Sequence, residues 1–226
     1  MLMYPKEKIL VSWSGGKDSV LSLYEIVKDR HFEITALLTV LTQDYDRVSM
    51  HGVRRIMLER QVESLGYSLE KIFIPKNASD KEYESRMVNT LQKYVLSSVR
   101  STVFGDIFLE DVRKYREENL SKIGMNALFP LWKKNSFQLA KQFIKLGFKS
   151  VITCTDSKSL STDFIGRKFD KEFLLDLPSN IDPMGENGEF HSFVYDGPLF
   201  KNRVQFELGD IVLRDGRFYY CDLIPL

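Results

Sequence analysis

Residues 9–23 read ILVSWSGGKDSVLSL, and this stretch decides the fold. Its first three residues are apolar, which is typical of a strand buried in a parallel sheet. Residues 14–19, SGGKDS, then turn the chain, and apolar residues with helical spacing follow from Val20. The stretch therefore predicts a strand, a tight glycine loop and a helix at the start of the chain.

The two adjacent glycines of this loop, Gly15 and Gly16, indicate a phosphate site. They allow backbone conformations that a Cβ would forbid, and they let amide N–H groups approach a ligand closely. The helix that follows leaves its first N–H groups unpaired and carries a partial positive charge at that end, so such a loop binds phosphate. The Walker and dinucleotide patterns both need residues between their glycines, so neither fits here.

Composition describes an ordinary globular chain. The 226 residues are 43% hydrophobic and 28% charged, with a net charge of +1, so neither nucleic acid nor a membrane surface is an expected partner. The two cysteines, Cys154 and Cys221, form no CxxC pair, which disfavours a zinc site. Because we see no signal-peptide core and no apolar run that could span a bilayer, we expect a cytoplasmic protein.

Strands and helices alternate as far as about residue 155. We expect further strands at 34–41, 71–74, 102–107, 127–131 and 150–155. Helices are expected between these strands, and the helix after strand 34–41 is expected to begin at His51. This alternation predicts a doubly wound, mainly parallel, Rossmann-like α/β sheet. Residues 157–226 read as a smaller α+β domain, with strands at 204–208 and 211–213 and a hairpin turn at Asp215 and Gly216. We therefore divide the chain into an ATP-binding domain, 1–156, and a C-terminal substrate-binding domain, 157–226.

Ligands of such sheets bind beyond the carboxyl ends of the strands. This rule selects four positions in the chain. They are the glycine loop, the 43–55 loop with His51, Gly105 with Asp106, and Thr155 with Asp156.

A second group of polar residues lies in residues 185–193, GENGEFHSF. If Phe190 lies in a strand, Glu189 and His191 project from the same face. A carboxylate and an imidazole placed together can hold magnesium, orient ammonia or move a proton. The alternative interpretation is a solvated hairpin with incidental charges.

The glycine loop resembles the pyrophosphate loop of the ATP pyrophosphatases, whose fold is that of the adenine nucleotide alpha hydrolases. Further motifs follow in order: GDI at 105–107 with Glu110, FPLW at 129–132, and GENGEFHSFVYDGPLF at 185–200. Together they resemble the diphthine–ammonia ligase family. The resemblance implies that ATP activates a carboxylate, that pyrophosphate is released, and that ammonia then displaces AMP.

The resemblance and the positions beyond the strand ends together give the expected site residues, with ATP and Mg²⁺ as the cofactors; the metal ligands are not assigned, although Asp18 is a candidate. The residues expected to bind ATP are Ser14, Gly15, Gly16, Lys17, Asp18 and Ser19. The residues expected to bind the acceptor are His51, Gly105, Gly185, Glu186 and Gly188. The residues expected to be catalytic are Asp106, Glu189 and His191.

The chain departs from this family in residues 186–192, which read ENGEFHS where members that make diphthamide tend to read EGGEYET. The variant with Phe190 and His191 is similar to a shorter subgroup typical of bacteria, which are not expected to carry diphthamide. The acceptor is therefore either a protein-bound diphthine or a small carboxylic acid. Free ammonia, or ammonia from a partner, is implied because no glutaminase-like segment is present.

Two other functions stay open. A tRNA-modifying ATP pyrophosphatase would be expected to show paired cysteines or a basic surplus, and the chain has neither. A non-catalytic sensor of adenine nucleotides would need no acceptor site such as residues 185–193. The sequence also leaves open whether the chain forms a homo-oligomer.

Overall fold

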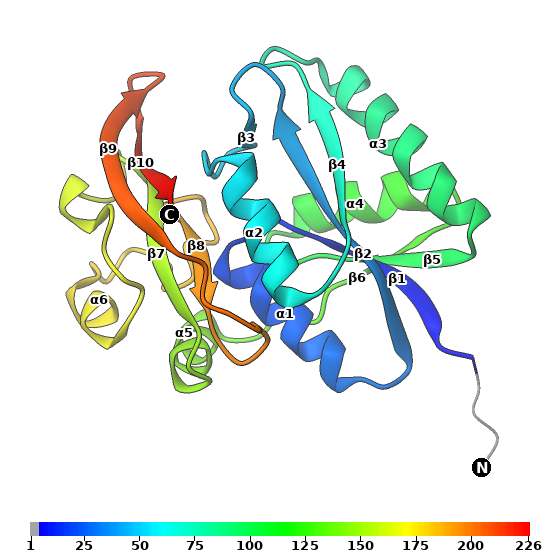
Figure 1. The fold of residues 1–226 in the computed structure, drawn as a ribbon, viewed down its shortest axis with the longest axis horizontal. Coiled ribbons are helices and arrows are strands. Elements are labelled where there is room, and N and C mark those ends of the chain that lie inside the picture. The colour runs from blue at the N-terminus through cyan, green and yellow to red at the C-terminus, as the bar shows by residue number, and fades with distance from the viewer. Residues whose placement is uncertain (1–4) are drawn as a thin grey trace.

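The computed structural model describes residues 5–226, which form two β-sheets (Figure 1). The first sheet has the strand order β3-β2-β1-β5-β6, and β4 also pairs with β2. Its parallel strands are β1 (Glu7–Ser12), β2 (Phe32–Thr42), β4 (Leu69–Ile74), β5 (Val99–Val103) and β6 (Asn126–Leu128). A two-residue strand, β3 (Arg47–Val48), pairs antiparallel with the end of β2.

Helices cover both faces of this sheet. They are α1 (Lys17–Lys28) and α2 (Arg55–Leu65) on one face, and α3 (Asp80–Leu96) and α4 (Glu110–Ser121) on the other. Alternation along β1 sends Ile9 and Val11 into the first apolar cluster and Leu10 into the second. A strand buried on both faces needs a continuous apolar run, and this confirms the predicted doubly wound α/β fold.

The second sheet is antiparallel and has the order β8-β7-β10-β9. Its strands are β7 (Lys149–Asp156), β8 (Phe190–Asp196), β9 (Phe206–Arg214) and β10 (Phe218–Pro225). The same part of the chain forms α5 (Ser136–Lys145), a short 3₁₀ turn (Thr162–Phe164) and α6 (Lys171–Asp176). An aromatic cluster that includes Phe143, Phe169, Phe173 and Phe190 fills its interior. Figure 1 shows α1 and α2 between the two sheets.

The prediction that residues 150–155 form a sixth strand of the parallel sheet is wrong. They lie in β7, which pairs antiparallel with β8 and β10. Asp156 consequently forms an ion pair with Arg217 of the second sheet and does not line the carboxyl edge of the first. An apolar run shows that a strand is buried on both faces, but it carries no information about which strands lie beside it. The division at residue 156 stays a prediction; the second sheet already begins with β7.

Smaller features differ as well. His51 lies in a turn four residues before α2 begins, so it does not open the helix. The two strands expected between 204 and 213 are one strand, β9, and the predicted turn at Asp215 and Gly216 joins it to β10 with φ values of 50° and 62°. Among residues 5–226, no helix combines the length and apolarity needed to cross a bilayer.

Candidate active site

The glycine loop joins β1 to α1 at the carboxyl edge of the parallel sheet, and both glycines are required by their surroundings. Gly15 has φ +78°, and a Cβ there would lie 2.7 Å from Leu58 Cδ1. Gly16 has an ordinary φ of −85°, but a Cβ would lie 3.1 Å from the Ser192 carbonyl oxygen and 3.2 Å from His51 Cε1. Gly15 therefore serves the fold of the loop, whereas Gly16 keeps a space open toward Ser192 and His51.

Gln61 holds the glycine loop in place, although it is not among the site residues predicted from the sequence. Its amide nitrogen donates to the carbonyl oxygens of Gly15 (2.9 Å) and Val194 (2.6 Å), and its Oε1 accepts from Trp13 Nε1 (2.9 Å). The Val194 N–H donates in turn to Gly15 O (2.9 Å), which ties the loop to β8. The signal in the sequence was a glutamine at a helical position whose neighbours on the same face of α2 are apolar. The structure shows that Gln61 is fully buried there, where its polar groups need hydrogen-bond partners.

Lys17, Asp18 and Ser19 occupy the first turn of α1. Lys17 is buried, with Nζ 3.2 Å from Asp18 Oδ2 and 4.8 Å from the centre of the Phe190 ring. Burial raises the pKa of Asp18, against the lowering effect of Lys17, and Asp18 Oδ1 has no hydrogen-bond partner among the described residues. The Ser19 and Ser14 hydroxyl oxygens lie 3.4 Å apart at the same end of the helix. A buried ammonium beside an incompletely paired carboxylate suits a ligand that brings both anionic and cationic groups.

His51 and His191 stack against each other beside the loop, with ring centres 4.4 Å apart and planes tilted by 36°. Burial lowers the pKa of both histidines, and the charge of Lys17 adds to the effect. The pKa of His191 falls to about 4, so this imidazole is neutral at pH 7. Two neutral imidazole rings beside the glycine loop can accept and donate hydrogen bonds without adding charge to the site.

The second sheet fixes the turn that carries His51. Asp222 of β10 accepts hydrogen bonds from Arg54 Nε (3.0 Å) and Arg47 NH1 (2.8 Å). The same Arg47 nitrogen donates to the carbonyl oxygen of Gly52 (2.7 Å). Arg54 is therefore held in a network of ion pairs. Because Arg47 links Asp222 of the second sheet to Gly52, the residue after His51, the position of His51 depends on how the two sheets pack together.

Glu186 joins the turn at 182–189 to the segment that follows β5. Its Oε1 accepts hydrogen bonds from the N–H groups of Ile107 (2.7 Å) and Phe108 (3.4 Å). Burial raises the pKa of Glu186 to about 7, and the carboxylate of Asp18 adds to the rise. A Cβ on Gly105 would lie 3.0 Å from the carbonyl carbon of Asp18, so these segments pack closely.

Asp106 and Glu189 each form side-chain interactions that the sequence did not predict. Asp106 forms an ion pair with Arg116 of α4, with 2.9 Å between Nε and Oδ2. Glu189 accepts hydrogen bonds from the Asp182 N–H (3.1 Å) and from the backbone and side-chain nitrogens of Asn187 (3.0 and 2.9 Å). Glu189 thus organises the turn at 182–189, and its catalytic role stays a prediction.

The predicted site residues meet at one place; Asp106 and Glu189, although engaged as described, lie near enough for their charges to act on Glu186 and His191 respectively. The assembled group consists of Ser14, Gly15, Gly16, Lys17, Asp18, Ser19, His51, Gly105, Gly185, Glu186, Gly188 and His191. Cys154 of β7 lies opposite His191 of β8, and burial raises the pKa of its thiol to about 12, as expected of a buried, unreactive cysteine.

A Glu186→Gln variant should be more stable than the wild type at pH 8 and equal to it near pH 4.5. The unfolded chain loses the Glu186 proton near pH 4.5, whereas the folded chain keeps it up to about pH 7, so wild-type stability falls as the pH rises through this window. Glutamine keeps the acceptor for Ile107 N–H and has no charge to desolvate. Because Glu186 is only partly buried, we expect a difference of about 1–2 kcal/mol at pH 8.

Urea unfolding at both pH values measures this difference. Glu172→Gln, at an exposed position on α6, is the matched control and should leave the pH dependence unchanged. A Glu186→Gln variant whose stability relative to the wild type does not change with pH would contradict the assignment.

A metal ion at this site would need a bound nucleotide to complete its coordination. Across residues 5–226, three or more His, Cys, Asp or Glu side chains nowhere come together as a metal site. The free Oδ1 of Asp18 suits Mg²⁺, which usually takes one or two carboxylates and completes its coordination with phosphate oxygens and water. The residues therefore fit a metal that arrives with a nucleotide.

Comparison with known proteins identifies the family. The model of the diphthamide synthase N-terminal domain matches residues 7–127, and that of the diphthamide synthase C-terminal domain matches residues 135–220. A protein of Schizosaccharomyces pombe named diphthine–ammonia ligase is 26% identical over 231 residues, which cover 91% of this chain. Proteins of the same name from Bos taurus and Homo sapiens are 25% and 24% identical, each over 88% of this chain.

These relatives differ in how much of their length the chain covers. The aligned part is 82% of the bovine and 83% of the human protein, but the chain spans only 37% of the length of the yeast relative. The N-terminal family model alone matches more than half of the chain, which confirms the predicted family. The chain therefore belongs to the diphthamide synthase family.

Proposed function

We propose that the chain is an ATP-dependent ligase that adenylates a carboxylate and amidates it with ammonia. One observation carries this proposal: the glycine loop and the 185–192 segment form a single site. Lys17 N–H donates to Ser192 Oγ (3.3 Å), a contact between residues 175 positions apart. The glycine loop and residues 185–193, which are far apart in the sequence, therefore lie against each other in the fold.

The nucleotide phosphates would bind at the start of α1. Gly16 caps this helix without a side-chain hydrogen bond, so N–H groups of the first turn are available to an anion. Lys17 supplies positive charge, and the Ser14 and Ser19 hydroxyls supply donors. Bound Mg²⁺ would neutralise phosphate charge, with Asp18 as the protein ligand.

The reaction we propose has two steps. A carboxylate oxygen of the acceptor attacks the α-phosphorus of ATP, the bond from that phosphorus to the bridging oxygen breaks, and pyrophosphate leaves. The ammonia nitrogen then attacks the acyl carbon, AMP departs with the shared oxygen, and the nitrogen loses a proton. Neutral His51 and His191 can hold uncharged ammonia and accept its proton, which protonated imidazoles cannot do.

The acceptor we propose is a small carboxylic acid. The names of the relatives specify diphthine for those proteins. This chain places a neutral His191 against His51 where diphthamide-forming members tend to carry a glutamate, so the charge facing the acceptor differs. Both cysteines are free and buried, in keeping with work in the reducing cytoplasm.

With its true acceptor, the protein should form AMP and pyrophosphate in equal amounts over many turnovers, and sustained turnover should require ammonia. Adenylation breaks ATP between the α- and β-phosphates, so ADP should not accumulate. A panel of small carboxylic acids, with a diphthine-bearing elongation factor as a separate arm, can be assayed for AMP by chromatography and for pyrophosphate by phosphorus NMR.

The other outcomes identify the alternatives. ADP as the main product would remove the protein from this chemistry. Turnover that requires tRNA instead of ammonia would identify a tRNA-modifying enzyme. Tight ATP binding without turnover in either arm would favour the nucleotide sensor.

A further inference from the structure

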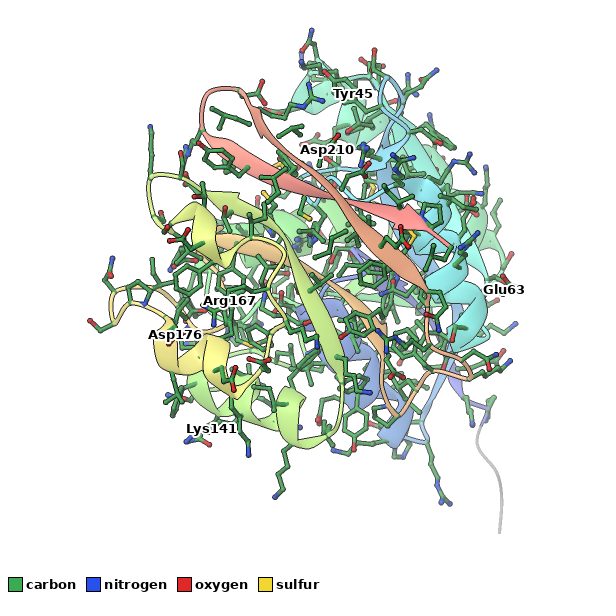
Figure 2. The ribbon with its side chains drawn as sticks, turned by 60° about the vertical axis from the view of Figure 1, so that its left-hand side comes forward. Tyr45, Glu63, Lys141, Arg167, Asp176 and Asp210 are labelled. Atoms are coloured by element: carbon green, nitrogen blue, oxygen red, sulfur yellow. The ribbon has the colours of Figure 1, made fainter. Side chains whose placement is uncertain are left out.

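The outer edge of β9 is unpartnered. This nine-residue strand ends the second sheet and pairs with β10 on one side only; within the described part of the chain, no strand lies against its other side. Figure 2 shows β9 at the surface, with Asp210 labelled near its middle. The strand contains neither lysine nor proline, two residues that commonly protect an exposed edge.

The apolar side chains of β9 are unusually exposed for a strand. Leu208 and Ile211 are each 53% exposed, Leu213 is 48% exposed and Val212 is 37% exposed. The pairing of β9 with β10 shifts register between Leu208 and Ile211 and is regular from Ile211 to Arg214. Since side chains alternate along that regular part, Ile211 and Leu213 lie on one face, and Val212 and Arg214 lie on the other. A free edge with exposed aliphatic groups on both faces is a surface suited to pairing with another strand.

Two of the three charged residues of β9, Asp210 and Arg214, are placed symmetrically about Val212. Asp210 precedes Val212 by two positions, at the register shift between β9 and β10, and Arg214 follows Val212 by two positions on the same face. Neither charged side chain forms an ion pair with any residue between 5 and 226, although nearby residues such as Asp222 and Arg217 do. Strands related by a two-fold axis at Val212 would therefore meet with opposite charges opposed.

We propose that β9 pairs antiparallel with β9 of a second copy of this chain, with the two Val212 residues on the two-fold axis. This register sets each Asp210 opposite Arg214 of the other copy, and each Ile211 opposite Leu213. Centring the pairing on Ile211 or Leu213 instead would set Val212 opposite a charge and leave the charges unpaired. The dimer joins the two antiparallel sheets into one continuous sheet of eight strands. Because a single strand edge is a small interface, dissociation at micromolar concentrations is expected.

Charge reversal tests the pairing on the full chain by sedimentation velocity from about 1 to 100 μM. The wild type should change from monomer to dimer across this range. Asp210→Arg and Arg214→Asp should each weaken the dimer by at least about tenfold, because like charges then face each other twice. The double variant Asp210→Arg/Arg214→Asp should restore dimerisation. Thermal unfolding of each variant shows that the monomer remains folded.

A cysteine substitution tests the register independently. Two Val212→Cys residues would face each other across the axis, within the Cα separation that a disulfide needs, and should cross-link under mild oxidation. Leu208→Cys is the control: Leu208 is more exposed, but its two copies would lie about 26 Å apart. The native cysteines, Cys154 and Cys221, are buried.

Three results would overturn the proposal. They are a wild type that stays monomeric at 100 μM, single charge reversals that dimerise as well as the wild type, and equal cross-linking through positions 208 and 212. The proposal does not depend on the ligase activity, so each can fail without the other.

Discussion

A Gly16→Val variant is expected to fold and to bind ATP at least about 100-fold more weakly than the wild type. Valine can adopt the φ of −85° found at this position, so the backbone is not strained. Its Cβ would lie 3.1 Å from Ser192 O and 3.2 Å from His51 Cε1, and its two methyl groups would extend further into the space where the phosphates are proposed to bind. A 100-fold loss corresponds to about 2.7 kcal/mol, which exclusion of a phosphate from its backbone donors readily supplies. Isothermal titration with ATP and Mg²⁺ measures the affinity, and circular dichroism verifies the fold.

Gly15→Val is the informative comparison. At this position φ is +78° and the new Cβ would lie 2.7 Å from Leu58 and 2.8 Å from Gln61 Oε1, so we expect reduced stability as well as lost binding. A folded Gly16→Val variant that binds ATP with wild-type affinity would show that the glycine loop is not the phosphate site.

His191→Ala is expected to lower turnover by about 10²–10⁴-fold while leaving ATP affinity nearly intact. The His191 ring lies against His51 and not in the glycine loop, so its removal takes away a proton acceptor but no phosphate donor. Titration with ATP and measurement of AMP formation separate the two effects. His31→Ala is the matched control because this histidine is exposed and pairs only with Asp29; it should change neither quantity.

Glu189→Gln should also lower turnover, but through the turn at 182–189. The Glu189 carboxylate accepts three hydrogen bonds, and an amide replaces one accepting oxygen with a donor facing Asn187. The variant should therefore unfold at a lower temperature than the wild type. Unchanged turnover in both variants, with the true acceptor present, would mean that residues 185–193 are only a hairpin.

Features that depend on local physical chemistry could be predicted from the sequence. The strand, glycine loop and helix at the start of the chain follow from an apolar run, two glycines and a helical period. The same reasoning located the turn at Asp215 and Gly216, which joins β9 to β10. The alternation of strands and helices then sufficed for the doubly wound fold, because parallel strands require crossover helices on the faces of the sheet.

Which distant segments meet depends on the packing of the whole chain and could not be predicted from local patterns. This packing placed β7 in the second sheet, because hydrogen-bond partners of a buried strand are not encoded in its own apolar pattern. It brought His51 against His191 and Gln61 against Gly15, contacts created by the packing of α2 and β8 on the loop. The pKa of Glu186 rises to about 7 for the same reason: desolvation and neighbouring charge are properties of an assembled site, and an isolated glutamate in the chain has neither.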